Sequence, residues 1–270
     1  MKRLIKLILA IVIFSVSCGL PDVTSISLEM NQPFITKLIP GPNSVTVEFK
    51  AQNNEPAFSG YNIYFGDSVN PQRYRLYNSQ KSRPTIIVGA SQNINTYTFT
   101  IEPRGYYSEG SGEVDTLTTS QLENGIPIYV WVSAYQITPQ AESYYYYDNY
   151  VKMATPRPEY PNQIISSGNT IISGSRQLAV LSGTAGNLQF QNVANGTMQM
   201  TGGTSLNDIT VPPTDGYGSA SLTVTAQRLY LVKITEGSDN YYGKIFVQSI
   251  NGESVTIDYC HQLSANILSY

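Results

Sequence analysis

The sequence predicts an all-β protein, and three observations lead to this fold class. Only 13% of the residues are charged, whereas tyrosine and glycine each occur 21 times. This balance of aromatic and turn-forming residues is typical of secreted β-proteins. Short segments alternate between apolar and polar residues, and Gly, Pro and Asn separate them, which is the pattern of half-buried strands joined by turns. None of these segments shows the sustained 3.6-residue periodicity of an amphipathic helix.

The segment 32–155 predicts an antiparallel sandwich near the N-terminus. Val45, Val47 and Phe49 alternate with polar neighbours, as in a strand with one buried face. The other strands expected in this segment are Tyr61–Phe65, Arg73–Tyr77, Pro84–Val88, Thr96–Ile101, Ile128–Tyr135 and Tyr150–Thr155. About seven strands in about 120 residues, with turn residues between them, favour a sandwich over an open sheet.

Three prolines in the segment 156–161 predict a stiff linker, because proline fixes φ and removes a backbone donor. Residues 162–270 return to short alternating segments and predict a second all-β domain. Its last three strands are expected to form a meander, because short turns separate them. These three strands are Leu229–Thr235, Lys244–Ile250 and Ser254–Cys260.

Two stretches of the first domain resemble strands of fibronectin type III domains. SVTVEFKAQNNEPAFSGYNIYFG (44–66) is similar to the B and C strands of that family, and Phe49 stands where the family usually has Trp. IPIYVWVSAY (126–135) is similar to the F strand, although Ile128 replaces the tyrosine of the family's tyrosine corner. The resemblance implies a fibronectin type III/immunoglobulin-like sandwich. It implies no particular function, because this module is a general scaffold.

Residues 1–17 predict a secretory signal peptide that ends immediately before Cys18. Three basic residues come first, the apolar run Leu7–Phe14 follows, and small or slim residues lead to the cysteine. The apolar run is shorter than the roughly 20 residues of a membrane-spanning helix. Two alternatives stay open, namely an uncleaved membrane anchor and cleavage at another position.

The residues before Cys18 resemble the lipobox of bacterial lipoproteins in its relaxed, spirochaete-type form, because Ser15 stands where many families have Leu. The resemblance implies acylation of Cys18, with palmitate-type chains, and makes residues 18–31 a lipidated tether. Several acyl chains anchor a protein stably, since each buried methylene contributes about 0.8 kcal/mol. Gly19 carries no acidic retention signal, so we expect a cell-envelope protein at the outer membrane or cell surface.

The charge balance argues against nucleic acid as a partner. The net charge is −3, and it becomes more negative when the basic signal peptide is removed. Binding to phosphates requires clustered Lys and Arg, which this chain lacks. The expected partners are therefore the membrane, through the lipid anchor, and a protein or a glycan.

The sequence offers few groups for catalysis. His261 is the only histidine, and in an extended strand neither Asp258 nor Cys260 points to its side. Cys260 is expected to be buried and unpaired. Spacings typical of metal sites are absent, and the acidic loop 105–115, although it contains Glu109, does not fit an EF-hand. We therefore expect no enzyme activity, no cofactor and no metal.

The most unusual local feature is a tyrosine-rich segment between the expected F and G strands. It contains Tyr144, Tyr145, Tyr146, Tyr147 and Tyr150. Four consecutive tyrosines cannot all face a core, because alternate residues of an extended chain point in opposite directions. Tyrosine offers a large amphipathic contact area at low entropic cost, so a binding surface is one interpretation. The other interpretation is a long hairpin whose tyrosines shield strand edges.

The C-terminal stretch LYLVKITEGSDNYYGKIFVQSINGESVTIDYCHQ resembles the last strands of HmuY-type hemophore lipoproteins. Members of that family hold heme between two histidines, whereas this chain has His261 alone, with Met198 and Met200 as conceivable further ligands. Three functions follow as hypotheses. The leading one is a non-enzymatic binding or adhesion-type surface protein; the others are a structural or assembly lipoprotein and a heme-type small-ligand carrier.

Overall fold

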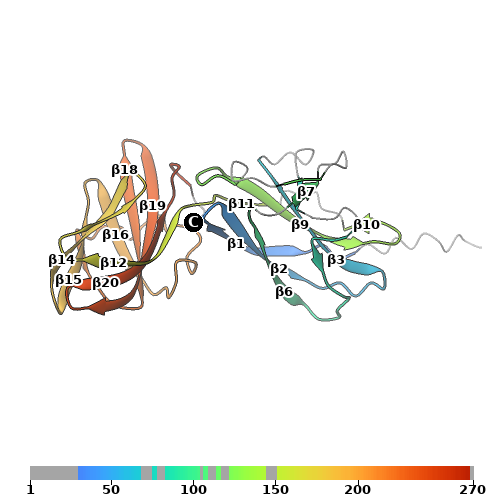
Figure 1. The fold of residues 1–270 in the computed structure, drawn as a ribbon, viewed down its shortest axis with the longest axis horizontal. Helices are drawn as coiled ribbons and strands as arrows, with labels where there is room; N and C mark the ends of the chain where they lie inside the picture. The colour runs from blue at the N-terminus through green and yellow to red at the C-terminus, as the bar shows by residue number, and fades with distance from the viewer. Residues whose placement is uncertain are drawn as a thin grey trace, which may run out of the picture.

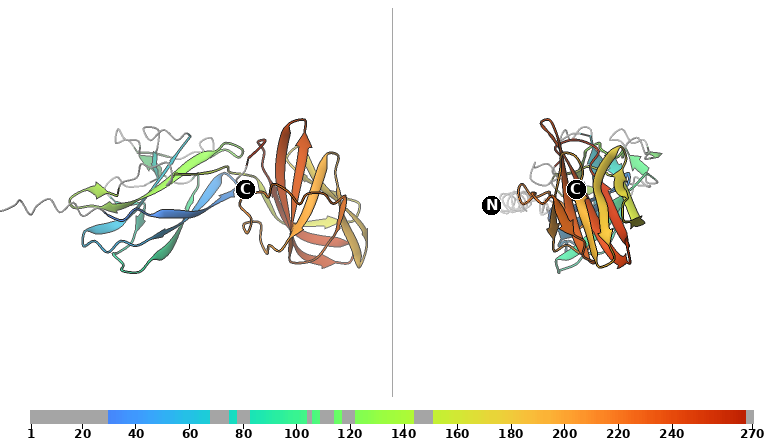
Figure 2. Two further views of the ribbon diagram at one scale, coloured as in Figure 1. Left: turned by 180° about the vertical axis from the view of Figure 1, so that it is seen from behind. Right: turned by 90° about the vertical axis from the view of Figure 1, so that its left-hand side faces the viewer.

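The structure, a computed structural model, describes residues 30–67, 75–77, 83–103, 106–108, 114–116, 122–143 and 151–267. Every regular element in these ranges is a β-strand, so the predicted all-β fold class is confirmed. The described residues contain no helix that is long and apolar enough to cross a membrane. The strands form two units that lie end to end (Figures 1 and 2). The expected signal peptide 1–17 and Cys18 lie outside the described residues.

The N-terminal unit is a sandwich of two antiparallel sheets. Its strands are β1 (Phe34–Gly41), β2 (Ser44–Ala51), β3 (Phe58–Gly66), β4 (Arg75–Tyr77), β5 (Ile86–Ile87), β6 (Asn95–Ile101), β7 (Tyr106–Ser108), β8 (Val114–Thr116), β9 (Ile128–Gln136), β10 (Ala141–Glu142) and β11 (Lys152–Ala154). One sheet has the order β1-β2-β6, and the other has the order β10-β9-β3-β4-β7-β8, with β11 also paired to β9 and β5 to β3. Immunoglobulin-like sandwiches divide their strands between two sheets in a similar way.

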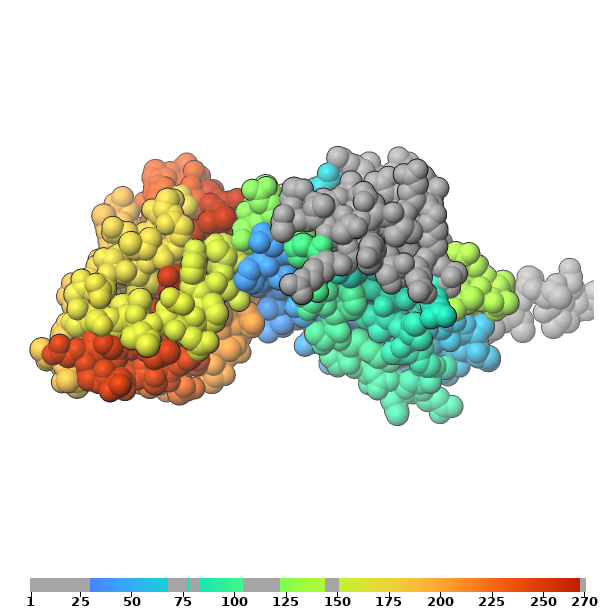
Figure 3. All heavy atoms as spheres, in the orientation of Figure 1, coloured from blue at the N-terminus to red at the C-terminus, as the bar shows by residue number. Residues whose placement is uncertain are grey.

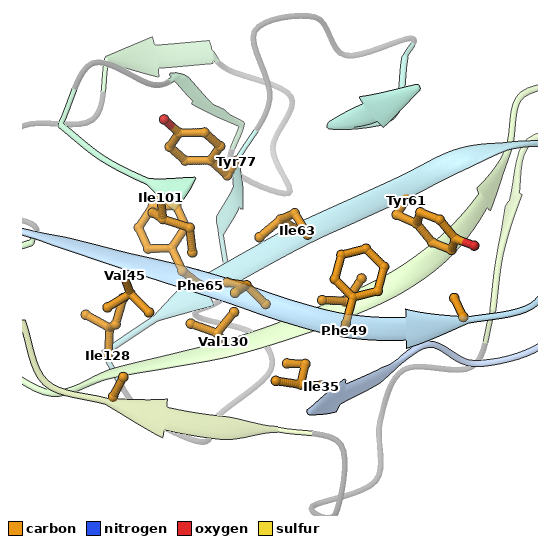
Figure 4. Close-up of a cluster of buried hydrophobic side chains, with 14 of the residues drawn as sticks. Ile35, Val45, Phe49, Tyr61, Ile63, Phe65, Tyr77, Ile101, Ile128 and Val130 are labelled. Atoms are coloured by element: carbon orange, nitrogen blue, oxygen red, sulfur yellow. The ribbon is translucent and has the colours of Figure 1, made fainter. Parts of the chain in front are cut away.

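The two sheets of this unit enclose a single apolar core. Figure 4 shows side chains of β2, β3 and β9 converging between the sheets, with Phe49 beside Tyr61. The rings of Phe49 and Tyr61 meet edge to face at 5.0 Å. Phe49, which stands where fibronectin type III domains usually have Trp, has no exposed surface and lies in the core. Each large apolar side chain buried here stabilises the fold by roughly 1.5–3 kcal/mol.

The first strand, β1, was not expected from the sequence. Its residues do not alternate, because the register against β2 shifts between Ile35 and Lys37. A bulge of this kind turns side chains out of the period-two pattern. The short strands β7, β8 and β10 were not expected either, since two or three residues carry no readable period.

The C-terminal unit also consists of two antiparallel sheets. Its strands are β12 (Glu159–Ser166), β13 (Thr170–Ser173), β14 (Arg176–Thr184), β15 (Asn187–Asn192), β16 (Gly196–Thr201), β17 (Ser221–Thr223), β18 (Arg228–Glu236), β19 (Asp239–Asn251) and β20 (Ser254–His261). The sheets have the orders β12-β20-β19-β18-β16 and β13-β14-β15-β17. Because β18, β19 and β20 are consecutive neighbours, the predicted meander is confirmed.

The five-stranded sheet of this unit is covered on both faces. One face packs against the other sheet through residues such as Val232 and Ile257. The opposite face carries Leu229 and Leu231, which pack with Leu206 from the loop after β16. The sheet therefore has an interior core and a second, smaller apolar cluster under a long loop.

The segment 156–161, expected to be a linker, belongs partly to β12, which begins at Glu159. Its prolines are compatible with a strand because β12 is an edge strand, where missing backbone donors are tolerated. The register against β20 shifts between Tyr160 and Gln163, around Pro161. A buried Arg157 precedes β12, and its backbone N–H donates to Gly41 O of the N-terminal unit at 3.0 Å.

One loop segment, 204–209, connects the two units through cationic side chains. Lys37 Nζ of β1 donates to Asn207 O at 2.6 Å, and Arg157 Nη2 donates to Asn207 Oδ1 at 3.3 Å. Lys244 Nζ of β19 donates to Leu206 O at 2.5 Å. The loop is therefore fixed between strands of both units rather than projecting into solvent.

Candidate functional site

The tyrosine-rich segment with Tyr144, Tyr145, Tyr146, Tyr147 and Tyr150 lies outside the described residues. The residues on both sides of it are described, and both sides are attached to β9. Glu142 pairs with Tyr135 at the start of the segment, and Lys152 pairs with Val130 at its end. The segment therefore leaves and rejoins the same buried strand.

Ser143 fixes the start of this segment firmly. Its backbone N–H donates to Ala134 O at 2.8 Å, and its Oγ accepts from the Ala134 N–H at 2.9 Å. The same hydroxyl donates to Gln32 Oε1 at 2.8 Å. Three hydrogen bonds thus join the residue before Tyr144 to β9 and to the residues that precede β1.

The carboxylate of Glu142 is held by donors from two strands. Its Oε1 accepts from Asn62 Nδ2 at 2.8 Å and from the Tyr64 hydroxyl at 2.7 Å. Its Oε2 accepts from Ser133 Oγ at 2.6 Å. The carboxylate reaches across the outer face of β9 and β3 and holds β10 at the edge of this sheet, which is a positioning role.

The face around Glu142 is unusually aromatic. The rings of Tyr64 and Trp131 stack with centroids 4.6 Å apart and an interplanar angle of 20°. Trp131 and Tyr135 are buried, although both belong to the alternate set of β9 that faces away from the core between the sheets. Burial, and next the charge of Glu142, raise the pKa of Tyr135 above its ordinary value.

This arrangement of Glu142, Asn62, Tyr64 and Ser133 was not predicted from the sequence. One signal was present, because the outward positions of the strand at 128–136 are Tyr129, Trp131, Ser133 and Tyr135 rather than charged residues. Such a set indicates a covered face. The identity of the covering residues depends on long-range register, which a single sequence does not show.

His261 and Cys260, which were expected to be poor candidates for catalysis, are buried, whereas Asp258 is half-buried. His261 Nδ1 lies 2.7 Å from Ser173 Oγ, and burial, then Arg176, lower the His261 pKa to about 4. Asp258 instead accepts hydrogen bonds from Asn162 and Gln248. Cys260 is free and buried, as predicted, and burial raises the pKa of its thiol. The His261 ring and the Cys260 thiol are therefore both shielded from solvent.

The conceivable heme ligands are not brought together for a cofactor. Met198 has no exposed surface and packs in the core of the C-terminal unit, whereas Met200 is half exposed. His261 is 1% exposed, so a macrocycle cannot reach its ring without displacing the surrounding strands. Within the described residues, no group of three or more His, Cys, Asp or Glu side chains is suited to hold a metal ion. Glu109 of the acidic loop lies outside the described residues.

Comparison with known proteins adds little to this geometry. No protein-family model matches the sequence, and no curated protein matches it. The crystal structure of a DUF4466 family protein from Parabacteroides merdae ATCC 43184 is similar to this chain, with 10% identity and a TM-score of 0.38. The match covers 85% of this chain and 97% of that one. A likeness at this TM-score assigns neither a family nor a function.

Proposed function

We propose that this chain is a lipid-anchored, extracytoplasmic surface protein that binds a protein or glycan partner without catalysing a reaction. The observation that carries the proposal is the attachment of the tyrosine segment, whose start and end are both held on β9. Recognition loops of this kind gain affinity when a rigid scaffold limits the entropy lost on binding. Tyr144, Tyr145, Tyr146, Tyr147 and Tyr150 are the proposed binding residues.

The course of the chain through the first unit indicates where the proposed anchor at Cys18 would place the membrane. Asn31 donates to Glu55 Oε1 and to Gln52 O, at the end of β2 that lies away from Gly41. Gly41, in contrast, contacts Arg157 at the start of the C-terminal unit. A membrane attached before residue 30 would therefore lie at the pole opposite the C-terminal unit, and the second unit would project outward.

The proposal is tested with full-length protein purified in detergent and applied to immobilised glycans and immobilised proteins. Replacing Tyr144, Tyr145, Tyr146 and Tyr147 together by Ser should weaken binding at least about tenfold, since losing an interface tyrosine hot spot costs about 2 kcal/mol or more. Replacing the same four residues by Phe keeps the ring area and should retain most of the binding. Equal binding by the Ser variant would overturn the role of the segment.

A second function, a structural or assembly lipoprotein, is favoured by the fixed contact between the units. Hydrogen bonds from Lys37 and Arg157 hold the loop 204–209 at the junction, as a spacer of defined length requires. In that case the protein should co-purify with a stable envelope complex after detergent extraction. It should also bind none of the immobilised glycans or proteins.

A further inference from the structure

Three loops meet at the end of the N-terminal sandwich that lies away from the C-terminal unit (Figure 1). They comprise residues 52–57, 88–94 and 137–140. The Ser91 N–H donates to Asn53 O at 2.7 Å, and Gln136, before the third loop, pairs with Phe58, after the first. We call these three loops the tether pole. In Figure 3 the first loop (light blue) and the third (yellow-green) lie at the right-hand end of the coloured part of the molecule.

The chain enters the fold at the tether pole. Met30 is 6% exposed and packs in the core. The Asn31 N–H donates to Glu55 Oε1 at 3.0 Å, and Asn31 Nδ2 donates to Gln52 O at 2.9 Å. Met30 follows Cys18 by 12 residues, and a chain of that length spans at most about 40 Å. A membrane that holds Cys18 therefore stays close to this pole.

Each sheet of the sandwich presents an exposed isoleucine at the tether pole. Ile94, directly before β6, is 69% exposed, and Ile137, directly after β9, is 43% exposed. Because β6 and β9 belong to different sheets, the two side chains occupy separate points of the pole. Apolar side chains of membrane-bound proteins enter the boundary between lipid headgroups and acyl chains. Two apolar points at one end of the molecule suit contact with such a boundary.

The tether pole presents no exposed carboxylate to a membrane. Glu55 is the one charged residue of the three loops, and it is 7% exposed, with Oε1 accepting from Asn31 and Asn53. Glu142, which follows the third loop, is engaged by the three donors described above. Lys50, just before the first loop, is an exposed cation, which anionic headgroups attract. The charges at this pole therefore favour approach to a lipid surface.

We infer that the tether pole rests on the lipid surface to which Cys18 is attached, with Ile94 and Ile137 inserted among the headgroups. Two isoleucines are too few to hold a soluble protein on a membrane. A short tether, however, raises the effective concentration of the pole at the surface to the order of millimolar, so weak partitioning is enough. The inference rests on the proposed lipid anchor. It adds a second, non-covalent contact, which sets the direction in which the C-terminal unit projects.

The test uses full-length protein reconstituted into vesicles of phosphatidylethanolamine and phosphatidylglycerol. An environment-sensitive fluorophore on Gln92→Cys reports on the tether pole, and the same fluorophore on Glu253→Cys reports on the turn between β19 and β20. Both residues are exposed, whereas Cys260 is buried and does not compete for the label. With lipid spin-labelled in the headgroup, the fluorophore at position 92 should lose most of its emission. The fluorophore at position 253 should keep its emission.

Substitutions at the two isoleucines separate insertion from mere proximity. Ile94→Glu combined with Ile137→Glu should abolish most of the quenching at position 92, because a carboxylate resists transfer out of water. Ile94→Leu combined with Ile137→Leu should retain it. Ile164→Glu is the matched control, because Ile164 is 74% exposed on β12 of the C-terminal unit and should leave the quenching unchanged. Unchanged circular dichroism shows that each variant is folded.

Flotation of the vesicles measures the anchor separately. Protein that does not float with the vesicles would reject the lipid anchor, and the inference with it. Protein that floats, but whose fluorophore at position 92 is quenched no more than the one at position 253, would reject the tether-pole contact alone. Quenching that persists in the double Glu variant would also overturn the inference. Self-association that the double Glu variant loses, without quenching in the wild type, would overturn it and assign the isoleucines to a second copy of the chain.

Discussion

Lys244 is a lysine with no exposed surface, in a β-strand between two other strands. Its Nζ donates to Leu206 O and, at 2.6 Å, to Ile209 O, so it satisfies two carbonyls of the loop at the junction. Burial, and next the nearby Arg157, lower the Lys244 pKa to about 7. A buried amine whose pKa is lower in the folded chain than in the unfolded chain makes stability depend on pH.

The direction of this pH dependence follows from the protonation of Lys244 in the folded and in the unfolded chain. Between pH 7 and the ordinary lysine value of 10.5, the unfolded chain holds a proton that the folded chain has released. The free energy of unfolding should therefore rise with pH, by up to about 1.4 kcal/mol per unit. Urea unfolding between pH 7 and about 8, below the ordinary pKa of a thiol or a tyrosine in the unfolded chain, should show this slope in the wild type and a flatter one in Lys244→Met. Equal slopes would contradict the account.

His261 should make the stability of the protein depend on pH in the acidic range. Its folded-state pKa of about 4 lies below the ordinary value of 6.5, so the unfolded chain takes up a proton first as the pH falls. Stability should decrease from pH 6.5 to pH 4 by up to about 3 kcal/mol from this group alone. The loss should be smaller in His261→Gln. An NMR titration of the ring that gives an ordinary histidine pKa would contradict the buried environment.

At the scale of single elements, Gly60 shows how one backbone position sets a strand. Its φ is +143°, and a Cβ there would lie 2.0 Å from the Ile86 carbonyl oxygen on the paired strand β5. Position 60, just before Tyr61, therefore requires glycine for two reasons. The backbone of β5 lies too close for a Cβ, and the φ angle is one that other residues rarely adopt.

Gly60→Ala should destabilise the N-terminal unit by at least about 2 kcal/mol, because backbone strain and the loss of the β3–β5 contact add together. Gly89→Ala is the matched control. Gly89 has nothing within 4 Å of its hypothetical Cβ and no positive φ, so its replacement should change stability by no more than about 0.5 kcal/mol. Chemical unfolding of both variants, followed by intrinsic fluorescence, measures the difference. A Gly60→Ala variant as stable as Gly89→Ala would show that the contact is absent.

The sequence predicted strands with a clear period of two, and it also predicted the strand at 244–250, whose register against β20 shifts. The segments at 45–50 and 96–101 alternate because each pairs in register along its whole length. β1 escaped notice because of its bulge, and the beginning of β12 because its prolines resemble a linker. Propensity and period carry local information, whereas bulges and edge positions depend on the partner strand.

The candidate site was predicted only in part, for a related reason. The tyrosines were noticed as a cluster in the sequence, but the side chains that hold the start of the segment come from three strands. Glu142 meets Asn62, Tyr64 and Ser133 only after β10, β3 and β9 have paired.

For the whole molecule, the end-to-end arrangement gives the two poles different surroundings. Asn31 lies at the pole away from the C-terminal unit, and Ser264 Oγ donates to Gly125 O at 2.7 Å where the units meet. The proposed lipid anchor would therefore hold one pole at the membrane. The C-terminal unit would remain accessible from outside.

The most direct test of the central proposal combines surface protease digestion of intact cells with mass analysis of the N-terminal peptide. The proposal predicts a peptide that begins at an acylated Cys18, from a protein that external protease degrades, and loss of the protein from membranes in Cys18→Ala. An unmodified Cys18, or cleavage elsewhere, would contradict the lipid anchor. An acylated protein that is protected until the envelope is broken would contradict the surface location and favour the assembly role.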